Sequence, residues 1–262
     1  MHFFGSLSIM AVVFMLFAAL CAGFIDAIAG GGGLIQLPAL LIGLPQSPVV
    51  QVLGTNKLSS FFGTSAAALM YRRRVKPDLR FTFAMALPAF LGSMSGASLA
   101  AHIPTHALRP IVLTMLIAVA IFTWRRPTLG EIELLRHTSQ RRLWLAVLAG
   151  AVIGFYDGIF GPGTGTFLMI VLVALLGFAF LTASSIAKVV NVSTNLGALV
   201  VFGLHGVILW RLGLLLALAN VSGGLLGAHV AIRGGSALVR RVFLLVTLVL
   251  IVKVGIDTAS HW

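Results

Sequence analysis

Two aspartates and two lysines lie isolated in the most apolar parts of this sequence. From Met1 to Tyr71 the only Asp, Glu, Lys or Arg residues are Asp26 and Lys57, and from Leu143 to Trp210 the only ones are Asp157 and Lys188. A charge at the centre of a bilayer costs about 2.5 to 3.5 kcal/mol on insertion scales, so these four groups must be paired, hydrated or neutralised. Lysine suits the binding of an anion, and aspartate suits a counter-charge or a proton acceptor.

A purely structural interpretation of the four charges stays open. Asp26 would form a buried ion pair with Lys57, and Asp157 would form one with Lys188, so that each pair joins two helices of its own half. Apolar packing can replace such a pair without loss of stability, whereas a transporter needs a charge that changes its partner. We therefore favour a functional role for all four residues.

Glycine clusters follow both aspartates and predict breaks in the helices. The stretches are AGGGGLIQLP at 29–38 and GPGTGTF at 161–167. Glycine leaves backbone N–H groups accessible, and a helix that restarts after a break presents a partially positive N-terminus to an anion. We expect Gly31, Gly32, Gly163 and Thr164 to contact the ligand there, although close helix packing also explains the small residues.

Neutral polar side chains surround both lysines. Helical spacing places several of them near Lys57 or Lys188, where they can donate hydrogen bonds to an oxyanion. Interhelical hydrogen bonding is the alternative explanation. The candidate residues are Thr55, Asn56 and Ser60 beside Lys57, and Asn191 and Asn195 beside Lys188.

The composition identifies an integral membrane protein. Of the 262 residues 59% are hydrophobic, with 18 basic and 6 acidic side chains, and the mean hydropathy is +1.08. The basic residues mark cytoplasmic loops, so the net charge of +12 does not indicate nucleic acid. A single cysteine excludes a disulfide framework and a thiolate metal cluster, and we expect no cofactor.

The expected fold is all-α with eight to ten transmembrane segments. Backbone N–H and C=O groups in lipid must form hydrogen bonds within the protein, so segments that cross the membrane should be helices rather than open strands. The first repeat spans 1–124, a basic cytoplasmic linker spans 125–142, and the second repeat spans 143–262. The predicted segments are 7–29, 34–45, 48–71, 81–101, 107–124, 143–160, 165–180, 184–204, 211–232 and 238–256. The segments 34–45 and 165–180 are short enough to be re-entrant half-helices.

A shift of 131 residues superimposes the two halves. It places GFIDAIAGGGG at 23–33 on GFYDGIFGPGT at 154–164, Lys57 on Lys188, Gly92 on Gly223 and Gly96 on Gly227. The basic loop 72–80 falls on the nearly uncharged 203–211, so corresponding loops lie on opposite sides of the membrane. This pattern predicts an inverted repeat, which is common in secondary transporters.

These motifs in order resemble the TauE/SafE family, specifically its YfcA-type members. The likeness runs from about Gly23 to Gly255 and includes GFIDAIAGGGGLIQLPALL, TNKLSS, GFYDGIFGPGTGTF and AKVVNVSTN. The resemblance implies a multi-pass permease of the bacterial inner membrane that carries sulfite, sulfonates or related small organic anions, coupled to an ion gradient. The second glycine cluster departs from the first at Pro162 and Thr164.

We therefore expect a secondary transporter of a small anion rather than an enzyme. Lys57 and Lys188 would anchor the anion, and Asp26 and Asp157 would couple its movement to a proton or cation. An anion channel is the alternative, and an intramembrane aspartyl protease using both aspartates is a further one. The expected partners are the anion and the lipid bilayer, without nucleic acid, and homo-oligomer formation stays open.

Overall fold

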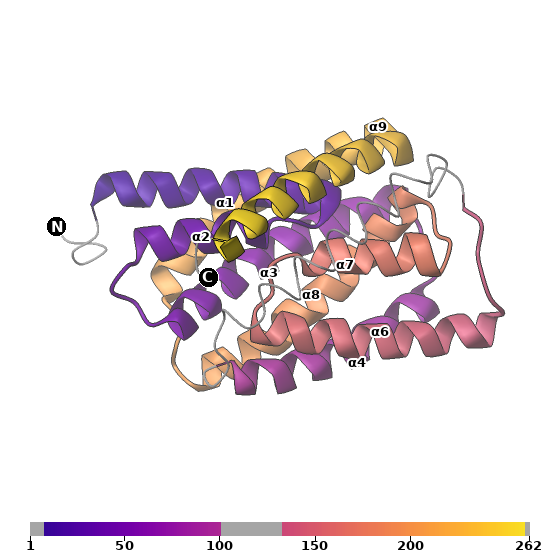
Figure 1. Ribbon diagram of the computed structural model, residues 1–262, viewed down its shortest axis with the longest axis horizontal. Coiled ribbons are helices and arrows are strands. Elements are labelled where there is room, and N and C mark those ends of the chain that lie inside the picture. The colour runs from indigo at the N-terminus through magenta and orange to yellow at the C-terminus, as the bar shows by residue number, and fades with distance from the viewer. Residues whose placement is uncertain (1–7, 101–132, 260–262) are drawn as a thin grey trace.

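The computed structural model describes residues 8–100 and 133–259, and these residues form helices aligned along one long axis (Figure 1). No strand occurs in these two ranges. The helices are α1 (Ile9–Ala29), α2 (Gly33–Gly43), α3 (Val49–Arg74), α4 (Leu79–Leu99), α6 (Ser139–Ile159), α7 (Thr164–Ile170), the π-helical η2 (Val171–Leu175), α8 (Phe180–Leu204) and α9 (Trp210–Ala259). The all-α prediction is therefore confirmed for this part of the chain.

Local sequence explains where several helices begin and end. Side chains of Ser8, Asp78 and Thr138 accept hydrogen bonds from backbone N–H groups in the first turns of α1, α4 and α6. Gly30 ends α1 with a φ of 81°, a backbone conformation that glycine adopts without strain. Gly235, with a φ of 64°, interrupts α9 between the two predicted segments 211–232 and 238–256.

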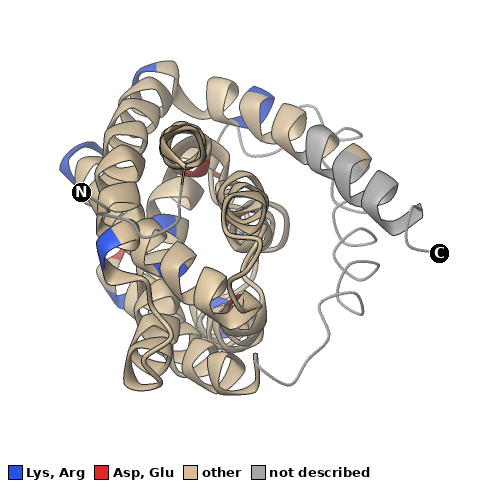
Figure 2. Ribbon diagram, turned by 90° about the vertical axis from the view of Figure 1, so that its left-hand side faces the viewer, with Lys and Arg blue, Asp and Glu red and all other residues tan. Residues whose placement is uncertain are grey.

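Five helices in the described ranges are long and apolar enough to cross a membrane, namely α1, α4, α6, α8 and α9 up to Val246. Figure 2, a view along the long axis, shows few charged residues among the described helices. The helix α3, with 26 residues, is also long enough to cross a membrane. It is not among these five helices because its polar side chains, most of them buried, lower its hydropathy. The predicted segment 107–124 lies outside the described residues.

The predicted segments 34–45 and 165–180 contain short helices. The helix α2 has 11 residues and extends about 16 Å, roughly half of a ~30 Å hydrocarbon core. It returns along α1, since Gly43 lies against Met15 and Gly32 lies against Ala22. The second short segment, α7 with η2, covers Thr164–Leu175. Each of these helices therefore restarts after a break in helical structure, and each is shorter than a full membrane crossing requires.

The most extensive packing joins helices from different halves of the chain. The main pairs are α1 with α9, α4 with α6, α3 with α9, and α4 with α8. The glycine contacts obey the same 131-residue shift as the sequence: Gly92 meets Ala151 as Gly223 meets Leu20, and Gly96 meets Phe155 as Gly227 meets Phe24. The matched glycines thus allow equivalent close approaches of helix backbones.

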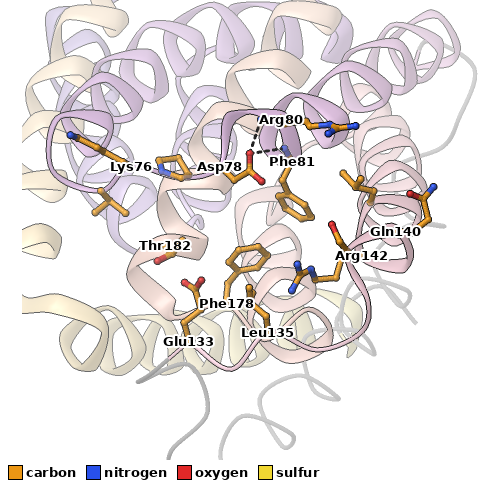
Figure 3. Close-up of a pocket in the computed structure, with 14 residues that line it drawn as sticks. Lys76, Asp78, Arg80, Phe81, Glu133, Leu135, Gln140, Arg142, Phe178 and Thr182 are labelled. Carbon is orange, nitrogen blue, oxygen red and sulfur yellow. Dashed lines mark hydrogen bonds between the residues drawn. The ribbon is translucent and has the colours of Figure 1, made fainter.

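The described basic loops gather at one end of the molecule. Arg80 of α4 and Arg142 of α6 line one cavity of about 580 Å³ with Lys76 (Figure 3). Arg74 and Arg233 line a second cavity. Because Arg74 and Lys76 are near neighbours in the chain, both cavities lie at the same end.

We expect Gly96→Ala to lower the unfolding temperature of the purified protein in detergent. The added Cβ would collide with the carbonyl oxygen of Phe155 on α6, and such overpacking costs about 1–3 kcal/mol. The matched control is Gly203→Ala in α8, where the nearest atoms to a Cβ are 3.8 and 4.0 Å away. An unchanged midpoint for Gly96→Ala would contradict the close packing of α4 on α6.

Candidate functional site

The break between α6 and α7 holds a buried ion pair. The Lys57 ammonium of α3 donates to Asp157 Oδ2 at 2.6 Å, and both side chains are 3% exposed. The hydroxyl of Thr164 lies 2.6 Å from Asp157 Oδ1 and 2.7 Å from the carbonyl oxygen of Gly161. A Cβ on Gly161 would lie 2.8 Å from Lys57 Nζ. The ammonium therefore packs directly on the glycine break, and both carboxylate oxygens have partners.

The break between α1 and α2 holds the corresponding pair. Lys188 of α8 lies 2.9 Å from Asp26 Oδ2 and also donates to the Asp26 carbonyl oxygen. That carbonyl belongs to the last turn of α1, where the helix dipole favours a cation. The hydroxyl of Thr64 lies 3.5 Å from the same carboxylate oxygen. The side chain of Asp26 is 15% exposed, so this pair is more accessible than the Asp157 pair.

The structural interpretation, in which Asp26 pairs with Lys57 and Asp157 pairs with Lys188, is wrong about the partners. Each lysine instead pairs with the aspartate of the other half. The reason is the packing of α3 against α8, together with the contact of Lys57 with the break of the second half at Gly161. The four charges thus join the two halves of the molecule rather than two helices of one half.

The two glycine breaks touch each other. A Cβ built on Gly165 would lie 2.5 Å from the Cα of Gly30, and one on Gly33 would lie 3.3 Å from the Cα of Pro162. Gly161 and Gly163 have φ angles of 90° and 86°, which L-residues rarely adopt. The first turns of α2 and α7 therefore meet beside the two ion pairs, and the predicted residues Gly31, Gly32, Gly163 and Thr164 all lie in this region.

The other predicted polar residues divide into two groups. Asn56, Asn191 and Asn195 are buried on the two helices that carry the lysines. Thr55, in contrast, donates to the Gln51 carbonyl oxygen and accepts a hydrogen bond from Leu209 N. It therefore links α3 to the turn before α9, and its assignment to the ligand site stays a prediction. Ser60 is half-buried on α3.

Three buried polar residues on α2, α3 and α9, namely Gln36, Ser59 and Asn220, were not predicted from the sequence. Asn220 of α9 donates to Gln36 Oε1 of α2 at 2.6 Å, and both side chains are buried. Gln36 Nε2, Asn56 Oδ1 and Ser59 Oγ are buried, and none of them has a hydrogen-bond partner among the residues that the structure describes. The 131-residue shift could have revealed them, because the positions equivalent to Gln36, Ser59 and Asn220 are the apolar Phe167, Val190 and Ala89.

Comparison with known proteins identifies the family. The chain matches the family model described as sulfite exporter TauE/SafE over residues 15–254. The chain belongs to the TauE/SafE family. It is similar to the probable membrane transporter protein ORF9 of Sinorhizobium sp, which is 38% identical over 94% of this chain and 93% of the relative. No solved structure matches the chain.

Two further TauE/SafE relatives have similar names. The probable membrane transporter protein YfcA of Escherichia coli K12 is 35% identical, covering 95% of this chain and 92% of its own. A probable membrane transporter protein of Haemophilus influenzae is 35% identical, covering 90% of this chain and 91% of its own. Together with its apolar helices, this membership identifies the chain as a multi-pass membrane protein of a transporter family.

Neither the TauE/SafE membership nor the geometry supports an intramembrane aspartyl protease. Such a protease needs two carboxylates that share a proton. Here Asp26 and Asp157 each lie against a different lysine. Both carboxylates are therefore held as counter-charges rather than as a dyad.

A double-mutant cycle tests whether each lysine pairs with the aspartate of the other half. Removing one member of a buried ion pair leaves an uncompensated charge and costs about 3–5 kcal/mol. Lys57→Met combined with Asp157→Asn should therefore destabilise the protein by clearly less than the sum of the single changes, as measured by thermal unfolding in detergent. The matched control combines Lys57→Met with Asp26→Asn, whose effects should be additive. Coupling in the control cycle, with additivity in the test cycle, would favour pairing within each half.

Proposed function

We propose that this protein is a secondary transporter of a small anion in the bacterial inner membrane, working by alternating access. The substrate class is a sulfur-containing oxyanion, a sulfonate or a small organic acid. The observation that carries the proposal is the pair of buried lysines, each of which forms an ion pair with a carboxylate of the other half. Both ion pairs lie beside the two glycine breaks between helices, which contact each other. This geometry supplies two cations at one place and two counter-charges that can leave them.

The chemistry of the breaks suits an anion. Both lysines are buried, and a small anion that replaces a carboxylate restores the charge balance that the low dielectric requires. The N-terminus of α2 adds the partial positive charge of a helix end beside the same break. Asn56, Asn191 and Asn195 are neutral and buried nearby on the lysine helices. They would add hydrogen bonds without the additional charge that would prevent release.

Proton coupling follows from the same charge balance. Each lysine is already neutralised, so an anion can bind only if a carboxylate gives up its cation. The displaced carboxylate would lie buried without a partner, and a proton neutralises it. One anion and one proton would then move together, with Asp26 or Asp157 as the proton acceptor. A different cation that takes the place of the proton would satisfy the same balance.

The arrangement of the helices supports an inverted repeat of eight to ten membrane segments. Figure 1 shows α1 beginning at the left and its counterpart α6 beginning at the right. The cross-half contacts repeat under the 131-residue shift, as a two-fold relation in the membrane plane would require. Alternating access would exchange the environments of the two ion pairs. In this conformation the Asp26 pair is the more accessible one, because the side chain of Asp26 is 15% exposed and that of Asp157 is 3% exposed.

We expect Lys57→Ala and Lys188→Ala to abolish anion flux into proteoliposomes while the protein still inserts. The substrate is first selected by thermal shift with sulfite, sulfate, thiosulfate, sulfonates and small carboxylates, since a bound ligand stabilises the native state. Flux should saturate and respond to an imposed proton gradient, which separates a transporter from a channel.

The matched control is Arg141→Ala, which removes an equal charge from an exposed position at the basic end. It should retain flux close to that of the unchanged protein. Normal flux in both lysine variants would refute the site, and non-saturating flux independent of the gradient would favour a channel.

A further inference from the structure

The parallel helices α3 and α9 line a basic cavity at the point where α3 ends. Gly54 lies against Ile208 at the start of the pair, and Gly63 lies against Asn220 further along. At the basic end a cavity of about 450 Å³ is lined by Met70, Arg73, Arg74, His229, Ile232 and Arg233. In the described ranges no carboxylate lines this cavity. Its three arginines form no ion pair with any residue that the structure describes.

An apolar groove lies on the same face of the two helices. It has a volume of about 380 Å³ and is lined by Phe62 of α3 and by Leu214, Leu218 and Val221 of α9, with Arg211 at its far end. Phe62 lies on the face of α3 that carries Leu69 and Arg73, because the three follow helical spacing. Leu69 and Leu225 are 62% and 42% exposed. They provide an apolar surface between the groove and the basic cavity.

The dimensions match one leaflet of a bilayer. Val221 precedes Arg233 by twelve residues, or about 18 Å along a helix. Half of a ~30 Å hydrocarbon core is of similar length. A phosphate between the arginines would therefore place the end of an acyl chain near Val221, inside the apolar groove.

We propose that the face formed by α3 and α9 binds an anionic phospholipid. The guanidinium groups of Arg73, Arg74 and Arg233 hold the phosphate and the negative headgroup, since arginine donates paired hydrogen bonds to phosphate oxygens. Basic cavities between membrane helices are suited to such headgroups. A soluble anion would leave the exposed apolar side chains of Leu69 and Leu225 uncovered, whereas an acyl chain would lie on them and reach the groove at Val221. The lipid would also join the end of α3 to α9 just before its interruption at Gly235.

The test measures lipid binding to the full-length protein by native mass spectrometry and thermal shift. Phosphatidylglycerol is compared with phosphatidylcholine and with inorganic phosphate. The cavity variant carries Arg73→Gln, Arg74→Gln and Arg233→Gln. The control variant carries Arg72→Gln, Arg141→Gln and Arg241→Gln, which remove the same charge from exposed positions outside the cavity lining.

We expect phosphatidylglycerol, and not phosphatidylcholine, to stabilise the unchanged protein. The cavity variant should bind phosphatidylglycerol at least about tenfold more weakly, while the control variant should bind within about twofold of the unchanged protein. All variants should have equal unfolding midpoints in phosphatidylcholine, because the substituted side chains are exposed. Equal weakening in both variants would overturn the proposal, as would full stabilisation by inorganic phosphate alone.

Discussion

The burial of two ammonium groups is the constraint on which the rest of this structure depends. Lys57 and Lys188 are both 2% exposed, and an unpaired charge in such a place would cost several kcal/mol. Each is neutralised by an aspartate from the other half, so the halves must pack closely at their centres. The glycine breaks permit this approach, because Gly30 and Gly165 would collide if either carried a Cβ.

Packing alone does not require these charges. A buried ion pair contributes little net stability, since the cost of desolvation offsets the attraction, and apolar side chains could join α3 to α6 as well. The two pairs also differ: Asp157 is closed in by Thr164, whereas the equivalent residue beside Asp26 is Gly33. Packing between the halves alone would not require this difference in accessibility, whereas the alternating access proposed above would use it.

Much of the fold follows from the sequence, but the pairing does not. Apolar runs and punctuation predict the helices within a few residues, as for 7–29 against α1 and 184–204 against α8. The isolated charges and glycines also identify the central region. The partner of each lysine depends on how α3 and α8 cross, which no local pattern encodes. The hydrogen bond of Thr55 with Leu209 N could not be predicted either, because helical spacing shows the face of a residue but not its neighbour. Gln36 and Asn220 were missed because they are uncharged and far apart in the chain.

The affinity of the Asp26→Asn variant for the anion tests the central claim most directly. If the carboxylate and the anion compete for Lys188, removing the carboxylate charge should tighten anion binding by about tenfold, or ~1.4 kcal/mol. The same variant should no longer take up a proton on binding at the accessible pair. Isothermal titration calorimetry in buffers of different ionisation enthalpy measures both quantities. Weaker binding, with unchanged proton uptake, would show that Asp26 does not compete with the anion and would contradict the exchange of partners proposed here.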